Sequence, residues 1–412
     1  MATVKPFQCI RPEISLAERV AALPYDVYNR KEARQETLRE PLSFLTIDRA
    51  ETQFPEEVDT YDPRVYVKAK ELLNEMLRKK ILVIDQDECY YVYELTMEGR
   101  AQTGIVACAS IDDYLNNVIK KHENTREEKE IDRIQHVDIC NAQTGPIFLA
   151  YRSMLAIDRM VEEVKQELPL YSFVAVDGIG HRVWRVAEAE RVNEIRTAFA
   201  ATGSIYIADG HHRAASAVKV GLKRRKEHPD YTGAEEFNSF LSVLFPHDQL
   251  MIMPYNRAVK DLNGLTVDAY LAKISENFDV VPVGNEPFAP KEKAVFGMYL
   301  EGKWYSLKAK EKLRDRKDPV KDLDVSLLQD YLLQPILGIE DPRTDKRIDF
   351  IGGIRGLQEL ERRVSEDMKV AFSMYPTSIT ELFEVSDAGR LMPPKSTWFE
   401  PKLRSGLFIH SL

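Results

Sequence analysis

Two imidazoles and a guanidinium stand side by side in the stretch Asp209-Gly210-His211-His212-Arg213. The β-branched and aromatic residues of 204–208 predict a short buried strand, and small and apolar residues recur at helical spacing from Arg213 onward. A strand that breaks at a glycine and leads directly into a helix leaves unpaired backbone N–H groups at the helix start, where the helix dipole favours an anion. With the cationic side chains added, this turn predicts a phosphate-binding site.

Two other interpretations of the turn stay open. Asp209 could cap the following helix, expected over residues 213–222, because Asp-Gly is a common turn and aspartate is a preferred N-cap residue. That role requires neither the histidines nor Arg213. The imidazoles could instead hold zinc, iron or nickel, although adjacent side chains at a helix start point in different directions and rarely share one ion.

A second group of candidates precedes another expected helix, over residues 125–137. Thr125 and Glu128 have the spacing of a capping box at its start. Capping explains those two residues without any catalysis. His122 and Glu123 lie just outside the helix, where side chains can project toward a ligand.

Three carboxylates are candidates for a general base, which must accept a proton from the reacting group. Glu123 is the first of them, because of its place outside the helix start. Asp26 follows, in the surface turn Pro24-Tyr25-Asp26-Val27, and Asp209 is the third.

The stretch from Asp209 to Arg213 resembles the phosphate-binding box of the ParB and sulfiredoxin superfamily, Gly-x-x-Arg at a strand-to-helix turn, and in particular the Asp-Gly-His-x-Arg version of the free serine kinase. Histidine at position 211 replaces the reactive cysteine of sulfiredoxin, so we do not expect sulfinic acid reduction. Over nearly its full length the chain resembles the DUF1015 family, sometimes described as ParB-like. The residues that carry this match are Pro24-Tyr25-Asp26-Val27, His122-Glu123-Asn124-Thr125, Ala208 to Arg213 and Pro393-Pro394-Lys395-Ser396-Thr397-Trp398-Phe399.

The resemblance implies an α/β fold of mixed α+β character, in which a ParB/sulfiredoxin-like core of mixed sheet and helices is elaborated by a C-terminal α/β region. It also implies a nucleotide-dependent phosphotransferase or phosphohydrolase, in effect a small-molecule kinase, that acts on a small hydroxyl-bearing metabolite. The expected cofactors are ATP or ADP, or CTP, together with Mg²⁺. The expected partners are this metabolite and the nucleotide, with allowance for a homodimer.

The site residues that the resemblance implies fall into two groups. The catalytic group comprises Glu123, Asp209, His211 and Asp26. The cofactor-binding group comprises Gly210, which would cradle phosphate oxygens, His212 and Arg213, which would neutralise the transferring group, and His122, Thr125, Lys395 and Ser396. The last two lie in the C-terminal stretch, which we expect to fold back over the phosphate site through Lys395, Ser396 or Lys402.

Two functions of other classes remain as alternatives. A ParB-like, DNA-associated switch would use the same box to hold CTP, and it would require a helix-turn-helix after the box. Residues 231–245 instead predict a loop and a strand. A metal-dependent hydrolase would require zinc, iron or manganese.

Composition narrows the classes further. The chain has 412 residues, of which 44% are hydrophobic and 30% charged, and a formal net charge of -9. The first two values are typical of a globular protein with a large core, and the net negative charge argues against binding chiefly to nucleic-acid phosphates. One basic run, Lys223-Arg224-Arg225-Lys226, is expected at a helix C-terminus, where cations complement the dipole.

The chain shows no targeting or membrane signal. No apolar run approaches the roughly 18 residues of a spanning helix, and the first residues lack a signal-peptide core. We therefore expect a cytoplasmic protein without a membrane partner. Four widely spaced cysteines predict neither a disulfide scaffold nor a structural zinc site, and most of them are expected to be small buried hydrophobes.

Hydrophobic periodicity and turn residues predict the remaining elements. The expected helices cover residues 64–82, 157–167, 187–200, 267–278, 326–334 and 378–385. The expected strands cover residues 89–96, 102–110, 147–151, 171–176, 182–186, 240–245, 294–300, 303–308 and 348–351. We expect one domain over residues 1–262, with the phosphate-binding turn, and a second α/β domain over residues 263–412.

Overall fold

The computed structural model describes all 412 residues and divides the chain into two compact units. Unit 1 comprises Met1–Leu250 and Pro401–Leu412, and unit 2 comprises Met251–Glu400. The first division falls at residue 250, whereas the sequence placed it at residue 262. It falls there because β13 (Met251–Met253) pairs with β20 (Trp398–Glu400) and so belongs with unit 2. The last twelve residues return to unit 1.

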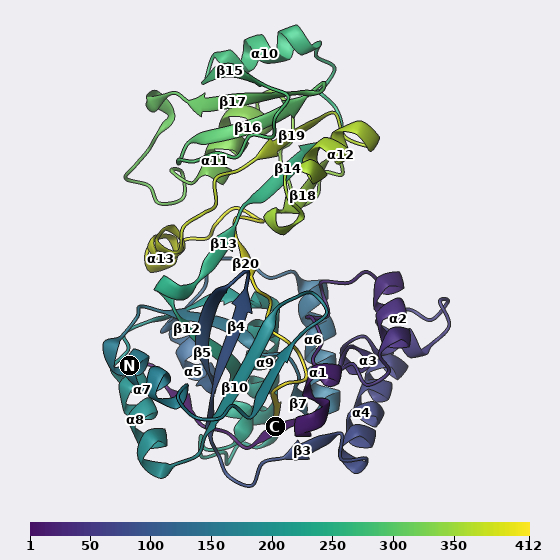
Figure 1. The fold of residues 1–412 in the computed structure, drawn as a ribbon, viewed down its shortest axis with the longest axis vertical. Coiled ribbons are helices and arrows are strands. Elements are labelled where there is room, and N and C mark those ends of the chain that lie inside the picture. The colour runs from purple at the N-terminus through teal and green to yellow at the C-terminus, as the bar shows by residue number, and fades with distance from the viewer. The chain divides into compact units, whose positions relative to one another are not determined.

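A nine-stranded mixed sheet lies at the centre of unit 1 (Figure 1). The strand order is β6-β11-β8-β12-β5-β4-β10-β9, with β1 paired to β5. The pairs β11/β6 and β12/β8 are parallel, and the other pairs are antiparallel. The strands are β1 (Val4–Lys5), β4 (Tyr90–Met97), β5 (Arg100–Ser110), β6 (Ile119–Lys120), β8 (Ile147–Tyr151), β9 (Tyr171–Val174), β10 (Gly180–Val186), β11 (Ile205–Asp209) and β12 (Ser239–Pro246). The predicted mixed α/β fold is therefore confirmed.

The hairpin β4–β5 illustrates how local sequence determines this sheet. Glu98 and Gly99 form its two-residue turn with φ of 52° and 79°. Two positive φ angles in succession match the right-handed twist of the flanking strands, and glycine adopts such an angle without strain. The two strands predicted over residues 89–96 and 102–110 are confirmed with nearly their expected bounds.

Helices pack on the sheet, and further helices form a group at one side of unit 1. Figure 1 shows α2, α3 and α4 grouped on one side of unit 1, and α7 and α8 on the other. Helix α9 packs against β8 and β12, and α6 packs against both α9 and α4. The helices are α1 (Ala17–Val20), α2 (Arg30–Arg39), α3 (Leu45–Asp48), α4 (Pro63–Arg78), α5 (Ile111–Leu115), α6 (Glu127–Cys140), α7 (Leu155–Val164), α8 (Ala189–Ala200) and α9 (His211–Glu227).

The C-terminal tail is built into unit 1 as a strand. Strand β21 (Ile409–Ser411) lies between β2 (Cys9–Pro12) and β7 (Ala142–Gln143), and β3 (Leu82–Ile84) completes a four-stranded sheet. The backbone N–H of Leu412 also donates to the carbonyl of Asn141 at 3.0 Å. The tail is thus held along its backbone, and its side chains reach other parts of unit 1.

Unit 2 consists of a six-stranded antiparallel sheet with short helices. The strand order is β15-β17-β16-β19-β14-β18. The strands are β14 (Tyr255–Val259), β15 (Phe278–Gly284), β16 (Val295–Leu300), β17 (Lys303–Ala309), β18 (Ile348–Gly352) and β19 (Val370–Ser373), and the helices are α10 (Val267–Ser275), α11 (Asp324–Leu328), α12 (Gln358–Glu366) and α13 (Ile379–Asp387). The helix predicted over residues 326–334 is observed as α11 followed by a π-helical turn, Gln329–Leu333.

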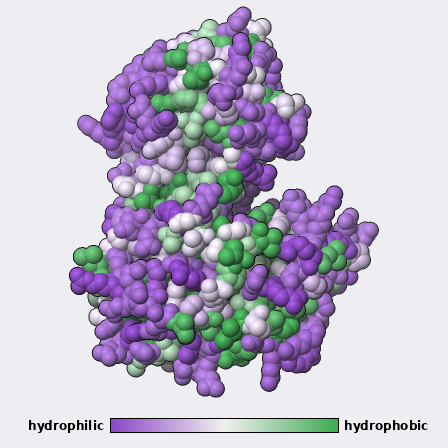
Figure 2. Space-filling model, in the orientation of Figure 1, coloured by the Kyte–Doolittle hydropathy of each residue, from purple (hydrophilic) through white to green (hydrophobic).

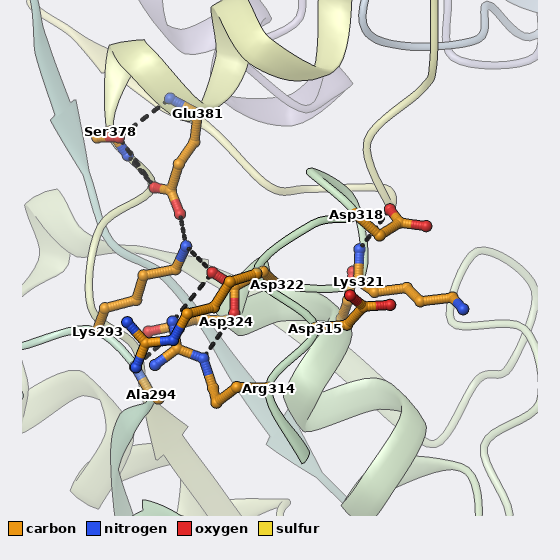
Figure 3. A network of polar contacts seen from close by, with 12 residues as sticks. Lys293, Ala294, Arg314, Asp315, Asp318, Lys321, Asp322, Asp324, Ser378 and Glu381 are labelled. Carbon is orange, nitrogen blue, oxygen red and sulfur yellow. Dashed lines mark hydrogen bonds and ion pairs between the residues drawn. The ribbon is translucent and has the colours of Figure 1, made fainter. Parts of the chain in front are cut away.

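A network of charged side chains ties the α11 and α13 regions of unit 2 together (Figure 3). The ammonium of Lys293 lies 2.8 Å from Asp322 and 2.6 Å from Glu381, and the guanidinium Nε of Arg314 lies 2.6 Å from Asp322. One oxygen of Asp324 accepts the backbone N–H of Ala294 at 2.8 Å, while its Oδ2 is buried without a partner. Burial raises the pKa of Asp324 to about 7.

The exposed face is mostly hydrophilic and the cysteines are buried, as the composition and the cysteine spacing led us to expect. Hydrophilic side chains dominate the face shown in Figure 2, with hydrophobic residues in smaller patches. Within the basic run, Lys223 and Arg224 pair with Asp138, and Arg225 pairs with Asp112. All four cysteines are buried and free. None of the helices is long and apolar enough to pass through a membrane.

Candidate functional site

The predicted strand-to-helix turn is present, and its glycine is required by the backbone. Strand β11 ends at Asp209, Gly210 adopts φ 93° and ψ 31°, and α9 begins at His211. A Cβ atom at position 210 would lie 3.0 Å from Nη2 of Arg213. Gly210 is the N-cap residue and no side chain caps the helix. The interpretation of Asp209 as the N-cap is therefore wrong, and the first-turn amides of α9 are left without a side-chain partner.

Two cations face the carboxylate that precedes the turn. Nη2 of Arg213 lies 3.7 Å from Oδ2 of Asp209, and Nζ of Lys402 lies 3.5 Å from the same oxygen. Desolvation would raise the pKa of Asp209, but these two charges outweigh it and hold this pKa well below its usual value. Nη1 of Arg213 donates to the carbonyl of Pro146 at 2.6 Å. The guanidinium is thus oriented by one backbone hydrogen bond, and its contact with Asp209 is looser than a hydrogen bond.

His211 and His122 form a buried pair of rings behind the turn. Their centroids lie 4.4 Å apart in an edge-to-face arrangement. His122 is only 2% exposed, and its Nδ1 has no hydrogen-bond partner. Desolvation lowers the pKa of His122 to about 4 and also lowers that of His211, so both rings are neutral at pH 7. Nδ1 of His211 lies 3.8 Å from Oε2 of Glu123.

His212 faces the opposite flank of the turn. Its Nε2 accepts the backbone N–H of Arg126 at 3.0 Å. Desolvation lowers the pKa of His212, whereas Asp26 and Glu130 raise it through their charges. Asp26 is therefore close enough to His212 to act on it electrostatically. Tyr25, which precedes Asp26, also lines a small cavity together with Arg213, although residues 25 and 213 are far apart in sequence.

The predicted capping box at the start of α6 is wrong. The N-cap residue is Arg126, and no side chain caps the helix. The hydroxyl of Thr125 donates instead to Glu130, which also pairs with Lys219 of α9. Thr125 thus helps to hold α6 against α9, because Glu130 is a charged group shared by both helices.

A polar cavity of about 410 Å³ opens beside these elements, and none of its helical residues was singled out by the sequence. Helix α6 contributes Lys129, Asp132, Arg133 and His136 to the wall of this cavity. The last three follow Lys129 by three, four and seven residues, so all four lie on one face of the helix. The cavity is lined by Tyr25, Asp26, Tyr28, Ile47, Asp48, Arg49, Ala50, Glu51, Asp59, Thr60, Tyr61, Val65, Tyr66, Lys129, Asp132, Arg133 and His136. A polar stripe at helical spacing was the sequence signal available for these residues, but such a stripe also fits a solvated helix face.

A smaller cavity of about 30 Å³ connects this wall to the turn. It is lined by Arg213 as well as Tyr25, Arg133 and His136, and the last three also line the larger cavity. The guanidinium of Arg133 lies 3.9 Å from the ring centroid of Tyr25 and 2.9 Å from Asp132. Tyr25, Asp48, Arg133 and His136 therefore belong to the walls of both cavities.

The structure brings several predicted site residues of unit 1 together. Gly210, His212 and Arg213 follow Asp209 in the turn, Glu123 lies beside His211, and the charge of Asp26 acts on His212. His122 is buried behind His211. The roles assigned to these residues stay predictions.

The C-terminal candidates divide between the two units. Lys402 belongs to unit 1 and pairs with Asp209. Lys395 and Ser396 belong to unit 2, where the ammonium of Lys395 lies 5.5 Å from the ring centroid of Tyr255 and the hydroxyl of Ser396 donates to the carbonyl of Pro393 at 2.6 Å. Their predicted role over the phosphate site stays a prediction.

The arrangement of residues gives no support to the two alternative functions, the metal-dependent hydrolase and the DNA-associated switch. The chain contains no group of three or more His, Cys, Asp or Glu side chains that could hold a metal ion. After α9 the chain forms one 3₁₀ turn, Glu236–Asn238, and then the central strand β12, rather than a second helix.

Comparison with known proteins gives one family and several distant structures. A family model described as "Protein of unknown function (DUF1015)" matches residues 4–326. A free serine kinase mutant in complex with ADP is similar with a TM-score of 0.35 and 16% identity, over 75% of this chain and 93% of that chain. C-terminally truncated SbnI from Staphylococcus aureus has a TM-score of 0.39 and 11% identity, over 74% and 87%. A conserved hypothetical protein from Pyrococcus furiosus has a TM-score of 0.35 and 16% identity, over 74% and 94%. No curated protein matches the chain.

Proposed function

The chain belongs to the DUF1015 family, and from its site we propose that it is a nucleotide-dependent phosphotransferase acting on a small hydroxyl-bearing metabolite. With water as the acceptor, the same site would act as a phosphohydrolase. The observation that supports this proposal is the uncapped start of α9, which stands with Arg213 next to a polar cavity whose wall includes Asp26. A phosphate group and a small acceptor could therefore be bound at adjacent positions.

The phosphate end of the site is the turn after β11. The first-turn amides of α9 point away from the helix, and its dipole adds partial positive charge there. Nη2 of Arg213 lies 3.7 Å from Asp209, beyond hydrogen-bond distance, so this end of the guanidinium can turn to a phosphate oxygen while Nη1 keeps its bond to the carbonyl of Pro146. Lys402, 3.5 Å from Asp209, adds positive charge beside the turn. This set suits the phosphates of ATP, ADP or CTP.

The acceptor end is the larger cavity. Its volume of about 410 Å³ lies in the range of small-molecule sites. Asp26 lines it and acts electrostatically on His212, so we assign Asp26 as the general base. Glu123 lies beside His211 and lines neither cavity, and Asp209 is held by two cations.

The reaction is a direct transfer in this proposal. The acceptor oxygen forms a bond to phosphorus, the bond from phosphorus to the bridging oxygen breaks, and that oxygen leaves with the nucleotide. The hydroxyl proton passes to Asp26. Phosphoryl transfer depends mainly on positioning and charge stabilisation, which the amides and Arg213 supply.

The residues fit a magnesium ion in the way that is usual for nucleotide complexes, in which one or two carboxylates add to phosphate oxygens. Asp209 is the residue that would hold it, because its carboxylate is ionised and 38% exposed beside the turn. When bound, the ion would stabilise negative charge on the phosphates.

Titration calorimetry with ADP, ATP and CTP, with and without magnesium, tests this function. We expect one nucleotide to bind the wild type and Arg213→Ala to weaken its binding at least about tenfold, because a charge-assisted hydrogen bond contributes roughly 1.5–3 kcal/mol. Lys226→Ala, at the exposed far end of the same helix, is the matched control and should bind as the wild type does. Absence of binding for all three nucleotides, or equal affinity in Arg213→Ala, would show that the proposal is wrong.

A further inference from the structure

The turn that carries Asp26 is held by a side chain from another element. Arg49 follows α3, and its Nη1 donates to the carbonyl of Tyr25 at 2.9 Å and to the carbonyl of Tyr28 at 2.6 Å. One guanidinium nitrogen therefore joins both ends of the segment that contains Asp26. Within the segment itself, the N–H of Val27 donates to the carbonyl of Pro24 at 3.1 Å.

Arg49 is itself fixed in place. Its Nε lies 2.6 Å from Oε1 of Glu51, and the Arg49 and Glu51 side chains are 12% and 2% exposed. A buried charge pair of this kind is costly to break, because removal of one partner leaves the other uncompensated. The planar guanidinium can bind a carboxylate and two carbonyls at once, which a lysine ammonium at the same place cannot reproduce.

A second contact holds the same segment from the other side. The ring of Tyr25 lies against the guanidinium of Arg133, 3.9 Å from its centroid, and Arg133 is held by Asp132. The backbone of the segment is thus held by Arg49 and its aromatic side chain by Arg133. Asp26 follows Tyr25 in this segment and lines the larger cavity together with Arg49 and Arg133, and its charge acts on His212.

We propose that Arg49 is a positioning residue that holds the Asp26 carboxylate in the wall of the larger cavity, from where its charge acts on His212. The catalytic meaning of this placement rests on the proposed function, in which Asp26 accepts the hydroxyl proton. The placement itself can be tested without any nucleotide, because the Asp26 charge acts on an imidazole that can be titrated.

The test is an NMR titration of His212 in the full chain, with ¹³C-labelled histidine and with His212→Gln to assign the signal. The charged or titratable groups around this ring are Asp26, Glu130, Arg126, Lys129 and His211. Asp26→Asn should lower the pKa of His212 by about 0.4, as expected for one charge at a distance of several ångströms in a partly exposed site. Arg49→Lys should lower it by a similar amount, and the double variant by no more than either single variant.

The control is Arg34→Lys, because Arg34 also donates to a backbone carbonyl, that of Phe54, but does not touch the Asp26 segment. It should leave the pKa of His212 unchanged. Glu51→Gln, which removes the charge that holds Arg49, gives a second test in the same direction if Arg49→Lys does not fold. An unchanged His212 pKa in Asp26→Asn, or in both the Arg49 and Glu51 variants, would overturn the inference, as would additive effects of Asp26→Asn and Arg49→Lys. Loss of nucleotide binding in calorimetry would instead contradict the proposed function and leave this coupling intact.

Discussion

The turn at residues 209–213 of unit 1, which we propose to bind phosphate, and the charged network of unit 2 contain similar side chains but differ in how these are paired. In the network of Figure 3, Lys293 and Arg314 meet Asp322 and Glu381 at 2.6–2.8 Å. At the turn, Arg213 and Lys402 stand 3.5–3.7 Å from Asp209, and the amides of α9 have no side-chain cap. Apart from Oδ2 of Asp324, the charged groups of the network are paired with one another, whereas the amides at the start of α9 have no side-chain partner.

This difference explains why charge alone does not identify a site. Both clusters contain carboxylates and cations, and both are partly buried. Spare donors beside a cavity indicate a ligand, because a buried donor that has no partner costs free energy until something binds it. We therefore interpret the turn as a binding site and the network as a structural element of unit 2.

The largest effect that separates the two regions is expected from Arg314→Met. Loss of the Arg314 guanidinium leaves the mostly buried carboxylate of Asp322 with Lys293 as its remaining ion-pair partner. We therefore expect unit 2 to lose about 3 kcal/mol of stability. Hydrogen exchange of residues 295–309 would report this loss. Arg316→Met is the matched control, since Arg316 and Glu311 form a well exposed pair that should contribute little.

Nucleotide affinity of Arg314→Met should equal that of the wild type, in contrast to Arg213→Ala. If Arg314→Met weakens nucleotide binding as much as Arg213→Ala does while hydrogen exchange is unchanged, the two regions have been interpreted the wrong way round.

Gly210→Ala should produce the next largest effect, at the turn. A residue with a side chain is strained at φ 93°, and the new Cβ would lie 3.0 Å from Nη2 of Arg213. We expect a loss of about 2 kcal/mol in stability together with weaker nucleotide binding, because Arg213 must move. Gly203→Ala, just before the same strand, is the control, as its φ is not positive and its added methyl would meet no atom within 4 Å.

Thermal unfolding and calorimetry on both glycine variants would measure these effects. Equal behaviour of Gly210→Ala and Gly203→Ala would contradict the conclusion that the backbone of this turn requires glycine.

Much of the fold could be predicted because its signals are local. The hairpin β4–β5, the strands β8 and β12, and the passage from β11 into α9 all follow from short runs of apolar and β-branched residues and from glycine at turns. The chemistry of Gly210 and Arg213 was likewise visible as a short motif. The return of the tail as β21 was not, because pairing of a three-residue strand with β2 leaves no mark on its own composition.

The site residues that were missed depend on long-range contacts. Arg133 and His136 of α6 looked like part of a charged helix face, but packing against α4 and α9 turns that face toward a cavity. Arg49 acts through backbone carbonyls, which have no sequence signature. Thr125 had the spacing of a cap, yet a shared carboxylate of Glu130 takes its hydroxyl. Arg49 bonds carbonyls that come more than twenty residues earlier, and Glu130 is in turn held by Lys219, far along the chain in α9.

The smallest of the effects that we expect in the two regions concerns Asp324 of the network, whose Oδ2 is buried without a partner. Asp324 has a pKa of about 7 in the folded chain, above its unfolded value near 3.9, because burial disfavours the ionised form. The folded state therefore binds the proton more tightly than the unfolded state. It follows that the contribution of this group to stability is most favourable below about pH 4 and is lost as the pH rises to about 7.

Asp324→Asn removes this dependence, since the amide oxygen can still accept the N–H of Ala294 and no proton is taken up. Between pH 6 and pH 8 the wild type should lose about 1 kcal/mol more stability in unit 2 than the variant does. Denaturant unfolding at several pH values, followed by hydrogen exchange of residues 295–309, measures the difference. Parallel pH profiles would mean that Oδ2 of Asp324 does have a partner in solution. The last unpartnered oxygen of the network would then be satisfied, and the contrast with the uncapped amides of α9 would become sharper.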